Sequence, residues 1–154
     1  MMKQGEGHGK DMKQEDQAST GSAEELTRGV RIIRWVFVCF ATIFTVCITI
    51  QIFFAGLAVF VSPTDWMRHM MFAHWFSALP LIMLILSFVG RLPRKIRLQS
   101  LGVFGLMYAV YFTANITAIS PLAAAVHPVI GVWLFCMSIT ILTQTARLAF
   151  NNPD

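Results

Sequence analysis

The sequence predicts an all-α integral membrane protein: an up-down-up-down bundle of four helices preceded by a polar N-terminal tail. Hydrophobic residues make up 56% of the 154 residues, and charged residues only 13%, about half the charged fraction of a typical soluble domain. Four apolar segments, at residues 35–61, 66–89, 96–119 and 125–148, each exceed the roughly 20 residues that a spanning helix needs. The short connections between them favour antiparallel neighbours in a bundle.

The first span follows a segment of very different composition. Residues 1–27 are polar and rich in Gly, Gln, Glu and Lys, which predicts a disordered tail before a transmembrane domain at residues 28–150. Lys and Arg gather before the first span, in the second loop at residues 91–97 and at Arg147, whereas the first and third loops hold only Arg68. The positive-inside rule therefore places both termini and the second loop in the cytoplasm.

The two outer turns predict where the second and fourth helices begin. Ser62-Pro63 and Ser120-Pro121 each combine a good N-cap with a proline that is tolerated at the first helical position. The second and fourth helices are therefore expected to start near Pro63 and Pro121.

Each of these two helices also contains an internal proline, Pro80 in the second and Pro128 in the fourth. Proline removes a backbone hydrogen bond and crowds the preceding turn, so both helices are expected to kink. The third helix, at residues 96–119, follows the Arg-rich loop and contains no proline.

One pattern occurs twice, and it indicates two similar helical hairpins. The same 58-residue interval separates the members of four pairs: Ser62 and Ser120, Pro63 and Pro121, His69 and His127, and Trp75 and Trp133. Each hairpin would then place one histidine at the same depth of its second helix. In an up-down-up-down bundle those two helices lie diagonally across the core, so the histidines can face each other.

Ionisable residues inside spans are costly, and here they are only His69, His74 and His127. The first hypothesis is haem b, held between His69 and His127, because haem iron accepts axial imidazole and bundles build such sites between facing helices. Arg68, beside His69, would pair with a propionate. Small residues one turn after each histidine, Ala73 and Gly131, would leave room for the macrocycle. The aromatic residues that could form walls around it are Phe72, Trp75, Phe76, Trp133, Tyr108 and Tyr111.

Three other hypotheses for these polar residues stay open. His69, His74 and His127 could form a metal site, although a five-residue separation turns His74 about 140° away from His69. A quinone carbonyl could accept a hydrogen bond from a histidine, with Gln51 or Asn115 as the polar partner. Alternatively, these polar residues could serve only as hydrogen bonds between helices in a structural or accessory subunit.

Several function classes lack sequence support. There is no HExxH or GxSxG motif and no acid inside a span, so no catalytic residue is identified. The net charge of +4 follows from the loop asymmetry, and no nucleic-acid-binding motif is present. The three cysteines, Cys39, Cys47 and Cys136, lie inside spans without CxxC spacing, so no disulfide is expected.

The residues that carry these features resemble a family of small bacterial four-helix membrane proteins known only as a domain of unknown function. The resemblance rests on Gln51, residues 54–60, Trp66 with His69 and His74, and residues 126–129, and it covers residues 30–147. It implies the four-span fold and a bacterial cytoplasmic membrane, and it implies no activity.

A looser similarity is to one half of haem A synthase and to membrane b-type cytochromes. Those proteins hold haem between histidines on the second and fourth helices of a four-helix unit. The similarity implies His69 and His127 as ligands. The expected partners are the lipid bilayer and a membrane redox partner or quinone.

Overall fold

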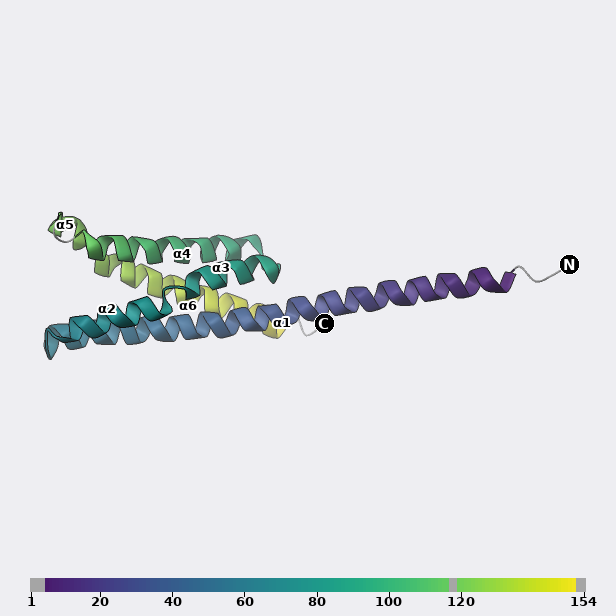
Figure 1. Ribbon diagram of the computed structural model, residues 1–154, viewed down its shortest axis with the longest axis horizontal. Coiled ribbons are helices and arrows are strands. Elements are labelled where there is room, and N and C mark those ends of the chain that lie inside the picture. Colours follow the sequence, from purple (N-terminus) through teal and green to yellow (C-terminus); the bar gives the residue numbers. More distant parts are fainter. Residues whose placement is uncertain (1–4, 117–118, 152–154) are drawn as a thin grey trace.

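The protein is an all-helical bundle in a computed structural model that describes the backbone of residues 5–116 and 119–151 and the side chains of residues 28–116 and 119–150 (Figure 1). Within these residues there are helices and no strand. The helices are α1 (Gly5–Phe60), α2 (Asp65–Phe76), α3 (Leu79–Val89), α4 (Arg94–Asn115), α5 (Pro121–Ala124) and α6 (His127–Asn151).

These helical segments form four rods, because α2 continues into α3 and α5 continues into α6. Each break lies just before an internal proline: Pro80 is the second residue of α3, and Pro128 is the second residue of α6. Proline is accommodated in the first turn of a helix, where its missing N–H costs nothing, so each rod is interrupted immediately before it. The predicted kinks at Pro80 and Pro128 are therefore confirmed.

The rods pack in the order in which they follow along the chain. Helix α1 packs against α2 and α3, α3 packs against α4, α4 packs against α6, and α6 returns to α1. This ring is the up-down-up-down bundle that the sequence predicts (Figure 1). It places the α2–α3 rod and the α5–α6 rod on opposite corners.

The interior of the bundle is mainly apolar, with buried residues from all four rods, and its buried Ser and Thr hydroxyls bond to carbonyls of their own helices. Phe37, Phe44, Met83, Val103 and Ile141 are all fully buried. At one end Arg34 of α1 donates a hydrogen bond from Nε to the carbonyl oxygen of Gly90, 3.2 Å away. This contact ties the basic second loop to the first rod.

The N-terminal segment is part of the first helix, and the predicted disordered tail stays a prediction. Helix α1 begins at Gly5, and its N-terminal half extends beyond the other helices (Figure 1), whereas the sequence predicts a disordered tail over residues 1–27. Between residues 10 and 27 the chain is rich in Lys, Gln, Glu and Ala, which are good helix formers. Local propensity therefore favours a helix in this polar segment.

Three stretches of the described chain are long and apolar enough to cross a membrane: Arg28–Phe60, Asp65–Val89 and Pro121–Phe150. They correspond to the first, second and fourth predicted spans. The third prediction, residues 96–119, is helical as α4 but is not among these stretches. Helix α4 contains Gln99, Ser100 and Asn115 together with two tyrosines, and these polar groups lower its mean hydropathy.

Candidate functional site: a histidine pair across the bundle

The structure brings His69 and His127 together. His69 lies on α2 and His127 is the first residue of α6, so they come from opposite corners of the bundle. Their ring centres are 6.5 Å apart, and the ring planes are inclined by 64°. Both side chains are partly buried. The break before Pro128 sets where α6 begins and so helps to position His127 opposite His69.

Both histidines are anchored in the same way. Nδ1 of His69 lies 3.1 Å from the carbonyl oxygen of Gln51 on α1, and Nδ1 of His127 lies 3.0 Å from the carbonyl oxygen of Val110 on α4. A carbonyl oxygen can only accept a hydrogen bond, so Nδ1 carries the proton in both rings. In the neutral form, each imidazole then keeps an electron pair on Nε2, the arrangement usual for a histidine that ligates a metal.

The anchoring repeats between the two hairpins. Each histidine bonds to a carbonyl of the first helix of its own hairpin, 18 residues upstream for His69 and 17 for His127. The twofold pattern seen in the sequence thus extends to these hydrogen bonds, although the anchoring residues, Gln51 and Val110, are not related by the 58-residue interval.

Gln51 makes a second contact with the first histidine. Its Nε2 donates a hydrogen bond of 2.8 Å to the carbonyl oxygen of His69, so the two residues exchange hydrogen bonds between α1 and α2. Its Oε1 is buried and has no hydrogen-bond partner among the described residues. Gln51 therefore holds α2 in place and leaves one buried acceptor beside the histidine.

Sequence reasoning did not predict that two further residues contact the histidines. Thr113 Oγ1 lies 3.3 Å from Nδ1 of His127, so the Nδ1–H of His127 is shared between this hydroxyl oxygen and the Val110 carbonyl oxygen. Trp66 packs edge-on against His69, with ring centres 5.5 Å apart. The three-residue spacing of Trp66 and His69 places both on one helix face and could have identified Trp66. No sequence signal marks Thr113 or the Val110 carbonyl.

Three predicted site residues lie apart from the pair. His74 is exposed, bonds through Nδ1 to the carbonyl of Met70 at 2.8 Å, and has its ring centre 5.5 Å from that of Tyr111. Arg68 forms a 2.9 Å ion pair with Asp65. Asn115 is exposed and donates to the Tyr111 carbonyl within its own helix.

The separation of His74 from the pair bears on the three-histidine metal hypothesis. No group of three or more His, Cys, Asp or Glu side chains that could hold a metal ion occurs in the described part of the chain. The structure therefore does not bring His69, His74 and His127 together among these residues, and a three-histidine metal site stays a prediction. The cause is the five-residue offset, which points His74 toward α4 and not toward His127.

The predicted aromatic walls are also only partly present. Phe72 packs against Phe54 with ring centres 5.4 Å apart. Trp75 and Trp133, expected as walls, are 84% and 61% exposed and so face outward. On α6, a methyl group added to Gly131 would meet no atom within 4 Å, in keeping with the expected space one turn beyond His127.

The two serine turns are less alike than the sequence suggests. Ser120 caps α5, because its Oγ accepts a hydrogen bond from the Ala123 N–H at 3.4 Å. Ser62 instead pairs with the Thr64 hydroxyl at 2.8 Å, and α2 begins at Asp65. The expected start near Pro63 is therefore two residues early, because Ser62 to Thr64 form a turn before the helix.

The spacing of the rings defines what the pair can hold. Two imidazoles that bind one ion from opposite sides place their ring centres about 6 Å apart, because each metal–nitrogen bond is about 2 Å long and each ring adds about 1 Å. The observed 6.5 Å matches this spacing. The donor set is two neutral imidazoles with no carboxylate.

The fold and the site together define a class: a helical bundle, with stretches able to cross a membrane, that holds two anchored histidines across its diagonal. The model of a family of unknown function, DUF6220, matches residues 51–118. This stretch includes Gln51, His69, His74 and Asn115 and ends before His127. No curated protein and no solved structure matches the chain. The predicted resemblance to a family of unknown function is confirmed over this stretch, and the looser similarity to haem proteins stays a prediction.

Proposed function

We propose that this protein is a membrane haem-binding module that uses His69 and His127 as the two axial ligands of haem b and transfers electrons. The observation that carries the proposal is the pair itself: two rings 6.5 Å apart, each with Nδ1–H bound to a backbone carbonyl. These two hydrogen bonds hold the ring proton of each histidine on Nδ1 and leave Nε2 free to bind iron. The chain's own contribution is to fix the tautomer and orientation of both ligands before binding.

The chemistry of the donor set favours haem iron over a bare metal ion. Structural zinc takes four protein ligands and catalytic zinc takes three, whereas iron in a porphyrin needs only one ligand on each side from the protein. Asp65 is the only carboxylate among the described side chains, and its Oδ1 is paired with Arg68. Two neutral imidazoles thus complete a haem site without further ligands.

The position of the pair supports the proposed choice of partners. His69 follows the first outer turn by a few residues, and Arg68 beside it is 69% exposed. Arg68 is therefore accessible to a propionate. With both termini in the cytoplasm of a bacterial plasma membrane, the pair lies toward the outer face, where a quinone or a membrane redox partner could exchange electrons.

An absorption spectrum of the detergent-purified full chain, expressed with haem available, tests the proposal. The expected result is a Soret band and, after dithionite reduction, sharp α and β bands of low-spin bis-histidine haem. His69→Ala and His127→Ala should each abolish it, while His74→Ala on the same helix and His8→Ala should not. A colourless wild-type protein, or an unchanged spectrum in both ligand variants, refutes the assignment.

A second candidate is a structural or accessory membrane subunit, and one observation favours it. The paired hydrogen bonds between Gln51 and His69 already join α1 to α2 without any ligand. Under this reading the purified protein is colourless, and His69→Ala lowers its thermal midpoint in detergent. Under the haem proposal the same variant loses pigment, and added haem no longer raises its midpoint.

A further inference from the structure

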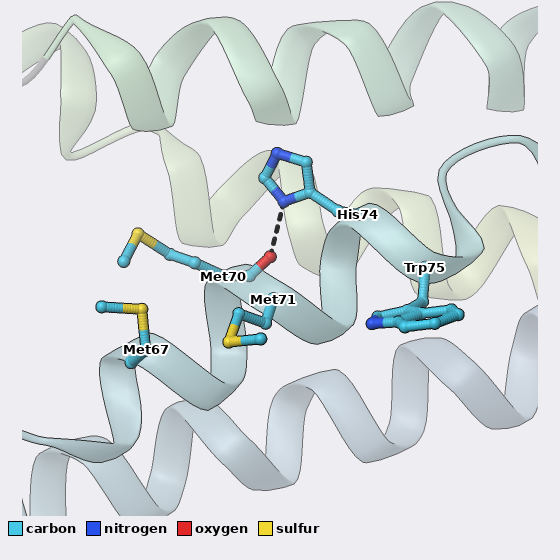
Figure 2. Close-up of a pocket in the computed structure, with 5 residues that line it drawn as sticks. All are labelled: Met67, Met70, Met71, His74 and Trp75. Atoms are coloured by element: carbon cyan, nitrogen blue, oxygen red, sulfur yellow. Dashed lines mark hydrogen bonds between the residues drawn. The ribbon is translucent and has the colours of Figure 1, made fainter.

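A second group of chemically distinctive residues lies on α2, apart from the histidine pair. Met67, Met70, Met71, His74 and Trp75 line a shallow pocket of about 410 Å³ (Figure 2). These five residues are called the methionine face. Figure 2 shows their side chains on successive turns of α2, with the Trp75 indole at the end opposite Met67. Neither histidine of the proposed haem site belongs to it.

The spacing of the methionine face follows the helix. Met67, Met70, Met71 and His74 stand at positions i, i+3, i+4 and i+7, which share one side of a helix. The methionines are accessible: Met67 and Met71 are 58% exposed, and Met70 is 51% exposed. By contrast, Met83 and Met107 pack in the core. The thioethers of α2 are therefore available to a ligand.

The rest of the same rod shows that an outward face does not require methionine. Helix α3 covers its exposed side with Leu81, Ile85 and Phe88. Within five residues α2 instead places three methionines, followed by a histidine and a tryptophan. Packing against lipid does not explain the difference, because leucine and isoleucine serve that role one helix away.

These side chains share one coordination chemistry. Thioethers are soft, neutral ligands that select Cu(I), and imidazole also binds copper. Nδ1 of His74 donates its proton to the Met70 carbonyl at 2.8 Å, so Nε2 keeps the electron pair. Methionine has three rotatable bonds, so sulfur atoms on adjacent turns can converge. An indole can cover a bound cation through its π-face.

We propose that the methionine face binds one Cu(I) ion through the thioethers of Met67, Met70 and Met71 and Nε2 of His74, with Trp75 covering it. Hard cations are disfavoured, because they require oxygen ligands and the Asp65 carboxylate is buried and paired with Arg68. The site is independent of the haem proposal: it uses no residue of the histidine pair and needs no electron transfer, because the ion enters and leaves as Cu(I).

The test is a competition titration of the detergent-purified full chain. Cys39, Cys47 and Cys136 are replaced by Ala, since thiolates bind Cu(I) tightly. Cu(I), kept reduced with ascorbate, is partitioned between the protein and bathocuproine disulfonate. Silver(I) serves as a probe of the same class that needs no reductant. We expect one ion per chain and quenching of tryptophan emission, with the quenching much reduced in Trp75→Phe.

The following variants distinguish methionines that bind a metal ion from methionines that only face lipid. Leucine matches methionine in volume, so replacing Met67, Met70 and Met71 by Leu preserves packing and should weaken Cu(I) binding at least tenfold. His74→Ala should weaken it by a smaller factor. Met137→Leu, a methionine on α6, is the matched control and should leave the affinity unchanged.

Two outcomes would overturn the site: no Cu(I) binding by the cysteine-free chain, or equal affinity in the triple leucine variant while circular dichroism shows it folded. The double variant His69→Ala/His127→Ala separates the two proposals. It should bind Cu(I) like its parent even where it binds no haem, so either site can fail while the other stands. Loss of Cu(I) binding in this folded double variant would instead place the ion at the histidine pair.

Discussion

Replacing Gln51 by Leu tests whether the Gln51 side chain makes one hydrogen bond to His69 and leaves one buried oxygen without a partner. The change removes the 2.8 Å bond from Nε2 to the His69 carbonyl and also removes Oε1, which is buried without a partner. It leaves the bond from His69 Nδ1 in place, because that bond goes to the backbone oxygen of residue 51.

The expected size of the effect follows from two opposing terms. A side-chain hydrogen bond between membrane helices contributes about 0.6 kcal/mol on average and about 1.7 at most. A buried acceptor without a partner costs about 1–3 kcal/mol. The cost of the buried acceptor is comparable to the hydrogen bond's contribution or larger, so Gln51→Leu should leave the stability of the ligand-free protein unchanged or raise it by about 1 kcal/mol.

The assay is equilibrium unfolding of the ligand-free protein by denaturing detergent, followed by circular dichroism. Thr49→Val is the matched control on α1, because the Thr49 hydroxyl bonds only within its own helix, to the Thr45 carbonyl at 2.9 Å. If Gln51→Leu destabilised the protein by more than about 2 kcal/mol, Oε1 would have a hydrogen-bond partner in the folded state. The interpretation of Oε1 as an unpaired buried acceptor would then be wrong.

The other predictions concern the turn, the second histidine and the topology. Gly90→Ala should destabilise the fold by about 1–3 kcal/mol in the same unfolding assay, because its new methyl group would lie 3.0 Å from the Leu86 carbonyl oxygen. The control Gly105→Ala, whose methyl group would meet open space, should not destabilise the fold. Equal effects of the two substitutions would contradict the packing around Gly90. Thr113→Val should keep the haem spectrum, because His127 retains its Val110 bond; a lost spectrum would make the hydroxyl essential. Reporter fusions should place residues 91–97 in the cytoplasm, and an outward signal would reverse the proposed orientation.

Several features could be predicted from residues because they depend on local chemistry. The internal prolines mark both helix breaks, since the ring excludes a hydrogen bond wherever it stands in a helix interior. The 58-residue pattern places His69 and His127 at equivalent points of two hairpins, and the short loops put the second helices of those hairpins on a diagonal. The start of α2 was less predictable, because Ser62 and Ser120 have the same neighbour but different turns.

The sequence by itself determined the helical class and the four rods, because hydrophobicity and proline act through the local chain. Only the tertiary structure decided which polar residues meet. His69 turns toward His127 while His74 turns toward Tyr111, and Asn115 bonds within its own helix. The physical reason is that the rotation of a helix about its own axis is set by packing against its neighbours, and spacing along the chain does not specify that rotation.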